Sequence, residues 1–105
     1  FDLIYFSFCL YLVPPEEIED AYKEADRFLK PGGFLAIHDF DVNEDITNPY
    51  HHVDGLNSYK RPNSKYFIDN LGYVLVAKKS YSHSGDDFNP EKDERISVEI
   101  LYKEK

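Results

Sequence analysis

Two apolar segments on either side of an amphipathic helix constrain the fold more than any other feature of the sequence. Residues 2–8 are nearly all apolar, which is typical of a strand buried on both faces of a parallel sheet. A helix then begins at Pro15, where the missing N–H costs nothing, and apolar residues recur at helical spacing over residues 18–29. A turn at residues 31–33 leads into a second apolar run, residues 34–38. Strand, helix and strand in this order predict a right-handed βαβ unit.

The later part of the sequence predicts one more helix and two more strands. The helix begins at Asn63 or Ser64 and ends at Gly72. Strands are predicted over residues 73–82 and 95–102, and no helix joins them, so they should be antiparallel. The expected fold is therefore a three-layer α/β architecture of order β-α-β-α-β-β. It has a helix on each face of a mixed sheet and an antiparallel last strand.

Composition limits the classes of function. The chain has 105 residues, enough for one domain, and a formal net charge of −8. This charge repels phosphate backbones and anionic membrane surfaces, which argues against nucleic acid or a membrane as partner. The single cysteine, Cys9, excludes an internal disulfide and a cysteine-only metal site. No apolar run approaches the roughly 20 residues of a membrane span and no signal peptide is visible, so we expect a cytoplasmic protein.

Two motifs, together with the helix between them, resemble a known enzyme family. Phe1-Asp2-Leu3-Ile4 opens the first strand, and Leu29-Lys30-Pro31-Gly32-Gly33 leads into the second. Their combination resembles the second half of the Rossmann-like S-adenosylmethionine-dependent methyltransferases. That family also ends with its last strand antiparallel, so the resemblance implies a sheet with the strand order first, second, fourth, third.

The resemblance also defines the expected function. The family's glycine-rich cofactor loop has no counterpart in this sequence, and the chain contains no methionine, even at position 1. We therefore expect residues 1–105 to be the C-terminal part of one methyltransferase domain, inactive by itself. By resemblance, the parent protein uses S-adenosylmethionine to methylate a small molecule. The substrate, the methylated atom and the use of a general base are not evident from the sequence.

The first candidate site residues follow the first strand. Ligands in open α/β sheets bind at the carboxyl ends of the strands, and residues 7–12 lie there. By the resemblance, Ser7 and Phe8 lie on the cofactor side and Tyr11 faces the substrate. The alternative is that Phe8 belongs to the hydrophobic core.

His38 and Asp39 end the second strand at the same edge and are the catalytic candidates. A histidine beside carboxylates can act as a general base, because a small shift brings its pKa near neutrality. The alternative is a histidine bonded to the backbone beside solvated aspartates.

The polar, irregular segment over residues 39–61 is long for a loop, and such loops are usually functional or disordered. Its histidine, tyrosine and lysine side chains suit a substrate with hydroxyls or negative charge, and the substrate-binding candidates are His51, His52, Tyr59 and Lys60. The alternative is a surface loop ordered by its tyrosines. No recognised ligand spacing is present, so no metal is expected.

Two other functions compete with methyl transfer. One is a different Rossmann-like enzyme that uses a nicotinamide cofactor. The other is a non-catalytic interaction or dimerisation module derived from a methyltransferase. In the resembled fold the first strand lies in mid-sheet, so here its outer edge would carry unpaired backbone groups. We therefore expect a homodimer through this strand.

Overall fold

The structure is a computed structural model that describes residues 1–49 and 55–105. Along the chain its elements are β1 (Leu3–Ser7), the short 3-10 helix η1 (Leu10–Leu12), α1 (Pro15–Phe28), β2 (Phe34–Phe40), β3 (Ile46–Pro49), β4 (Asn57–Lys60), α2 (Asn63–Leu71), β5 (Val74–Ser82) and β6 (Arg95–Tyr102). The main sheet has the order β1-β2-β6-β5, with β1 parallel to β2 and β6 antiparallel to both of its neighbours. The predicted α/β class, the βαβ unit, the mixed sheet and its strand order are confirmed.

Two glycines lie where the helices lead into the strands that follow them. Gly72 has a φ of 72° and ends α2 in the left-handed conformation, as predicted. Gly33 lies where the chain passes from α1 into β2, and a Cβ there would lie 2.8 Å from the backbone oxygen of Asp2 and 2.8 Å from Leu29 Cδ1. Only glycine fits this close approach, because one of the two obstacles is backbone.

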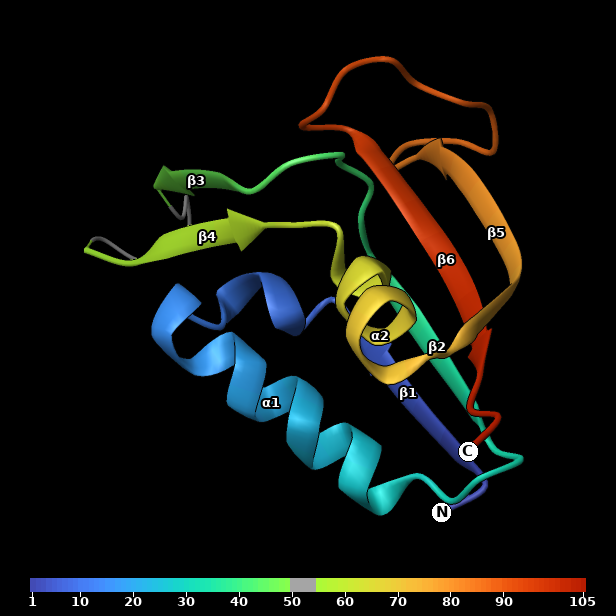
Figure 1. Cartoon of the computed structure of the whole chain (residues 1–105). Helices are drawn as coiled ribbons and strands as arrows, with labels where there is room; N and C mark the ends of the chain where they lie inside the picture. Colours follow the sequence, from blue (N-terminus) through green and yellow to red (C-terminus); the bar gives the residue numbers. More distant parts are fainter. Residues whose placement is uncertain (50–54) are drawn as a thin grey trace.

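Both helices pack against the same face of the main sheet, so the expected third layer is wrong for the described residues (Figure 1). The ring of Tyr22 on α1 lies 5.1 Å from the ring of Phe67 on α2, and both belong to one core cluster with Leu35 and Leu101 of the sheet. Sequence periodicity shows that a helix has an apolar face but not which side of the sheet it covers. This is why the placement of the helices could not be predicted.

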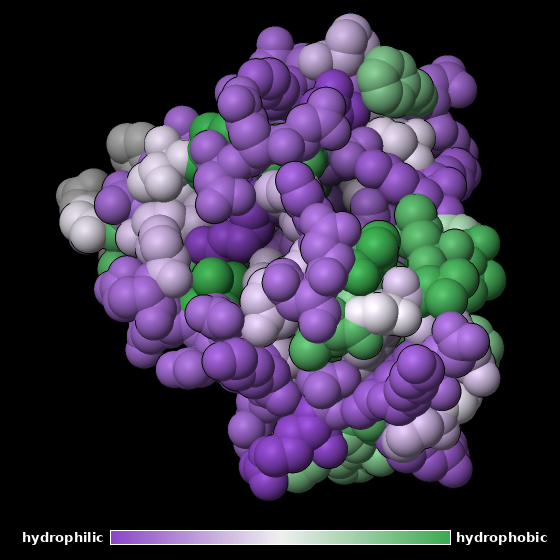
Figure 2. All heavy atoms as spheres, viewed as in Figure 1, coloured by the Kyte–Doolittle hydropathy of each residue, from purple (hydrophilic) through white to green (hydrophobic). Residues whose placement is uncertain are grey.

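The face of the sheet opposite the helices is apolar and open. β1 was expected to be buried on both faces, but its side chains alternate between exposed and half-buried, and Leu3 and Tyr5 are 60% and 55% exposed. The reason is that α1 and α2 both cover the other face. On the helix side of the molecule, Figure 2 shows hydrophobic side chains at the border of the sheet formed by β5, where Val74, Leu75 and Val76 are exposed.

The segment expected to be irregular contains a β-hairpin. β3 and β4 pair antiparallel, with Ile46 opposite Lys60, and Figure 1 shows this ribbon projecting away from the main sheet. The prediction of an irregular segment is wrong here because each strand is only four residues long and polar, so neither has an alternating apolar pattern. The described residues contain no helix long and apolar enough to cross a membrane.

Candidate functional site

The parallel strands bring several polar and aromatic segments to one edge of the sheet. β1, β2 and β5 all run in the same direction, so their carboxyl ends meet at that edge. The hairpin and the loop between β5 and β6 lie at the same end of the sheet (Figure 1). This is the edge at which ligands bind in open α/β sheets.

His38 lies at this edge on the open face, between two tyrosines. Its Nε2 lies 2.5 Å from the hydroxyl of Tyr81, and its Nδ1 lies 3.3 Å from the hydroxyl of Tyr5. Burial, together with the nearby His83, lowers the pKa of His38 from its usual 6.5. The imidazole is therefore neutral at physiological pH, with a tyrosine hydroxyl facing each ring nitrogen.

Phe8 is held over this histidine by an unusual backbone conformation. It is the only described residue other than glycine with positive φ, at 51°. Its N–H donates to the carbonyl oxygen of His38 at 2.8 Å, and its ring centroid lies 4.6 Å from the imidazole centroid. A positive φ is rare for a bulky residue and is found most often at functional sites. Ser7 precedes it, exposed, and pairs with His38 across the strands.

Asp39 points to the other face of β2, because successive strand residues alternate. It is only 4% exposed, and its Oδ1 accepts a hydrogen bond from the N–H of Phe40 at 2.7 Å. Its Oδ2 is the one buried side-chain oxygen or nitrogen in the described residues without a hydrogen-bond partner. Burial raises the pKa of Asp39 to about 6, although the backbone N–H groups of Phe40 and Tyr11 and the more distant Arg61 and Lys60 oppose the shift.

Lys60 at the end of β4 and Arg61 just after it are buried cations, and each has partners within the protein. Lys60 Nζ lies 2.7 Å from Asp93 Oδ1 and 4.4 Å from the ring centroid of Phe40. Arg61 donates to the carbonyl oxygens of Leu10 at 2.9 Å and Val13 at 2.7 Å. Arg61 therefore fastens the end of the hairpin to the segment that follows β1.

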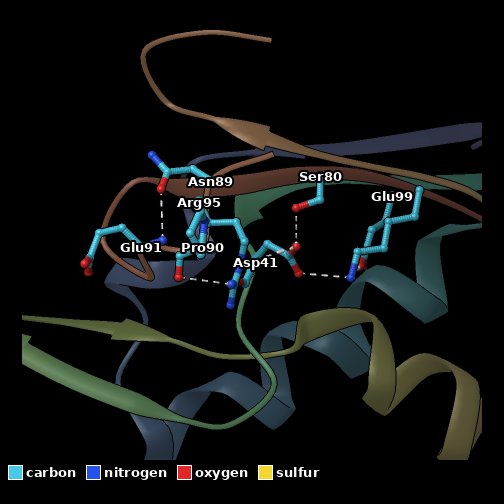
Figure 3. A network of polar contacts seen from close by, with 8 residues as sticks. Asp41, Ser80, Asn89, Pro90, Glu91, Arg95 and Glu99 are labelled. Atoms are coloured by element: carbon cyan, nitrogen blue, oxygen red, sulfur yellow. Dashed lines mark hydrogen bonds and ion pairs between the residues drawn. The ribbon is translucent and has the colours of Figure 1, made fainter. Parts of the chain in front are cut away.

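A second polar network lies just beyond Asp39 (Figure 3). Asp41 Oδ2 accepts a hydrogen bond from Ser80 at 2.6 Å, and its Oδ1 lies 2.9 Å from Lys78 Nζ. Burial would raise the pKa of Asp41, but the hydrogen bonds from Ser80 and Lys78 outweigh it, so the pKa is lowered. Lys78 also reaches Glu99 at 3.3 Å, and the Glu99 carboxylate accepts a hydrogen bond from Ser64 on α2.

These groups border a cavity of about 260 Å³ between the helix-facing side of the sheet and the beginning of α2. Its apolar lining comes from three elements and the segment after β2, and includes Ile37, Val42, Ile68 and Leu75. Asp39 is the buried carboxylate in its lining. The cavity can hold a small molecule with both apolar and polar parts.

The structure brings most of the predicted site residues to one edge but divides them between two faces. Ser7, Phe8 and His38 gather on the open face, and Asp39 lies on the helix-facing side. Tyr11 on η1 packs its ring 5.4 Å from that of Phe40.

The hairpin supplies the remaining predicted site residues. Tyr59 is half-buried on β4, and the Arg61 guanidinium lies 5.7 Å from the centre of its ring. Lys60 follows it on β4, buried and paired with Asp93. His51 and His52 lie outside the described residues.

Sequence reasoning missed three residues whose side chains make contacts at this end of the sheet. Tyr81, Glu99 and Lys78 meet their partners only through the strand order of the sheet. Strands over residues 73–82 and 95–102 were predicted, but the register that pairs β6 with β2 and with β5 was not available from the sequence. Within residues 1–49 and 55–105, no three His, Cys, Asp or Glu side chains are placed to hold one metal ion.

Comparison with known proteins agrees with the resemblance found in the sequence. A family model described as a methyltransferase domain matches residues 1–37. Among solved structures, the chain is similar to the Burkholderia thailandensis 1,6-didemethyltoxoflavin-N1-methyltransferase, crystallised with 1,6-didemethyltoxoflavin and S-adenosylhomocysteine, at a TM-score of 0.74 and 14% identity. Comparison with curated protein sequences gave no match. The fold is thus similar to that of this methyltransferase, and the methyltransferase resemblance is confirmed over residues 1–37.

The extent of the structural match is asymmetric. It covers 99% of this chain and 44% of the Burkholderia chain. The described fold therefore corresponds to less than half of that methyltransferase.

Proposed function

We propose that the chain forms the C-terminal part of an S-adenosylmethionine-dependent methyltransferase domain that acts on a small molecule in the cytoplasm. The observation that carries the proposal is the strand order β1-β2-β6-β5 with an antiparallel last strand, found together with a methyltransferase-domain match over β1 and α1. The methyltransferase similar in structure has S-adenosylhomocysteine, the product of such a reaction, bound to it.

The residues divide into three roles under this proposal. Ser7 and Phe8 border the cofactor, and His38 and Asp39 are the groups that could take a proton. The substrate candidates are Tyr11, Tyr59 and Lys60, together with His51 and His52, which lie outside the described residues. In the reaction, a lone pair on the acceptor forms a bond to the methyl carbon while the methyl–sulfur bond breaks. The acceptor's proton passes to a base or to water, and alignment of the acceptor supplies most of the rate enhancement.

The test is cofactor binding by residues 1–105 alone and by the longest natural protein that contains this sequence. We expect micromolar affinity for S-adenosylmethionine in the longer protein and weak or no binding by the chain alone, since no glycine-rich loop is present in it. Titration calorimetry measures both affinities. If the longer protein binds no S-adenosylmethionine, the proposed function is wrong.

A second candidate function is self-association through β1, and the unpaired long side of this strand favours it. In the described residues β1 pairs only with β2, so its other edge has unpaired N–H and C=O groups. Beside this edge, β1 and α1 form an apolar groove of about 450 Å³ whose lining includes the exposed Phe1 and Phe28. We propose a second copy of the chain as the occupant, with two β1 strands antiparallel about a two-fold axis.

Sedimentation over a dilution series tests this second candidate. The variant Leu3→Lys places a charge on the exposed side of β1 and should shift the chain towards monomer. Leu56→Lys is the matched control, because Leu56 is 52% exposed and lies far along the chain from β1. A monomeric wild-type chain at high concentration, or equal effects of the two variants, would contradict it.

A further inference from the structure

A line of three side chains crosses the open face of the sheet from β5 to β1. The hydroxyl of Tyr81 on β5 lies 2.5 Å from Nε2 of His38 on β2, and the hydroxyl of Tyr5 on β1 lies 3.3 Å from Nδ1 of the same ring. We propose that Tyr81 is a positioning residue, which fixes His38 with its proton on Nδ1 and thereby leaves the hydroxyl of Tyr5 as an outward hydrogen-bond donor. The tautomer of His38 does not depend on the proposed function, whereas a role of the Tyr5 hydroxyl towards the methyl acceptor rests on it.

The two contact distances assign the proton. A neutral imidazole has one N–H and one bare nitrogen, so only one of the two tyrosines can donate to it. Hydrogen bonds donated by hydroxyls are about 2.5–3.0 Å long, and those donated by N–H groups to oxygen are about 2.7–3.2 Å long. The contact of 2.5 Å at Nε2 therefore fits the Tyr81 hydroxyl donating to a bare nitrogen. The contact of 3.3 Å at Nδ1 lies nearer the N–H range, so Nδ1 carries the proton and donates to the oxygen of Tyr5.

The imidazole is held in one orientation by its neighbours. The N–H of Phe8 donates to the carbonyl oxygen of His38 at 2.8 Å, and the Phe8 ring centroid lies 4.6 Å from that of the imidazole. The ring of Tyr81 is tilted from the imidazole by only 26°, with centroids 5.9 Å apart. A half-turn of the imidazole about its Cβ–Cγ bond would place carbon atoms against both tyrosine hydroxyls. The observed orientation is therefore the one in which both ring nitrogens are hydrogen-bonded.

The consequence of this arrangement falls on Tyr5, which is 55% exposed on the open face. Because its oxygen accepts from the Nδ1–H group of His38, its own O–H points away from the imidazole. The exposed Ser7 lies two residues further along the same face of β1, at the carboxyl end of the strand. A donor fixed here suits a ligand with a lone pair on a carbonyl, carboxylate or ring nitrogen atom. It does not suit a cationic group.

The test is the tautomer of His38, measured from ring ¹⁵N chemical shifts in two-bond ¹H–¹⁵N NMR spectra of residues 1–105. The spectra are recorded at about pH 8, above the usual histidine pKa of about 6.5. We expect the proton on Nδ1, although free histidine in water favours Nε2. Tyr81→Phe removes the donor to Nε2 and should shift the tautomer ratio roughly threefold to tenfold towards Nε2–H, the effect of one neutral hydrogen bond. Tyr5→Phe leaves that donor in place and should keep the proton on Nδ1.

A control variant distinguishes this role from a general effect on the open face. Tyr102→Phe is matched, because Tyr102 lies at the other end of β6 and its ring is 5.4 Å from that of Phe34, so the ratio should not change. The wild-type spectrum alone already tests the tautomer, so the test does not depend on the folding of a variant. A wild-type proton on Nε2, no response to Tyr81→Phe, or an equal response to Tyr102→Phe would overturn the proposal. Because no methyl donor is present, this outcome is separate from success or failure of the proposed function.

Discussion

Burial of Asp39 should make the stability of the chain depend on pH in an unusual direction. Burial raises the pKa of this carboxyl from its usual 3.8 to about 6. Between these two pH values the folded state binds more protons than the unfolded state, so the free energy of unfolding falls as pH rises through the window. At 1.36 kcal/mol per pKa unit, the loss above the window is about 3 kcal/mol. The amide in Asp39→Asn cannot ionise, so this variant should be about 3 kcal/mol more stable than wild type near pH 7.5.

Urea unfolding of both proteins, followed by circular dichroism from about pH 4 to about pH 7.5, measures this difference. The advantage of Asp39→Asn should shrink as the pH falls towards about 4, where the wild-type carboxyl is neutral in the folded state and about half protonated in the unfolded state. Other groups such as Asp41, whose pKa is lowered, cancel because they are present in both proteins. Asp20→Asn, on the exposed surface of α1, should show no comparable dependence on pH. A difference that stays constant with pH, or a wild type more stable near neutral pH, would refute the reasoning.

Three further predictions concern the core and the open face. Gly33→Ala should lower the free energy of unfolding by about 1–3 kcal/mol, because its Cβ would collide with backbone, and a thermal melt equal to wild type would contradict this. Phe67→Ala, at a side chain with 0% exposure, should cost about 3–5 kcal/mol in urea unfolding. Phe88→Ala, at a side chain that is 63% exposed, should cost far less, and similar losses would count against the assigned core. Burial lowers the pKa of His38, so its NMR titration midpoint should lie below 6.5, and a midpoint above that value would disprove the burial argument.

The elements of the main sheet were predictable because each is defined by local sequence. Apolar runs predicted β1 and β2, and proline and glycine predicted where the helices begin and end. Because no helix precedes β6, this strand was predicted to run antiparallel to β5. The hairpin was not predictable, since Ile46–Pro49 and Asn57–Lys60 are polar and short. β4 packs against η1, and Arg61, which follows β4, donates to the carbonyl oxygens of Leu10 and Val13, more than 40 residues away in sequence.

The environment of Asp39 was not predictable for the same reason. In the sequence it follows His38 and precedes two further polar or aromatic residues, which suits a solvated strand end. Its burial arises from segments distant in sequence, and Arg61, between β4 and α2, lines the same cavity. Local sequence pattern thus predicted the end of the sheet at which the candidate site residues lie, while the distinction between exposed and buried groups at that end required the tertiary structure.

The geometry separates the two catalytic candidates, which are neighbours in sequence. His38 and Asp39 alternate on β2, so their side chains face opposite sides of the sheet and cannot serve one reacting atom together. Both ring nitrogens of His38 face tyrosine hydroxyls, whereas Oδ2 of Asp39 is buried and has no hydrogen-bond partner within residues 1–49 and 55–105. A general base needs a free atom within hydrogen-bond reach of the proton it removes. Asp39 Oδ2 is buried within the protein and the ring nitrogens of His38 face hydroxyls, so neither group offers such an atom in this arrangement, and His38 is better suited to positioning Tyr5 and Tyr81 on the open face.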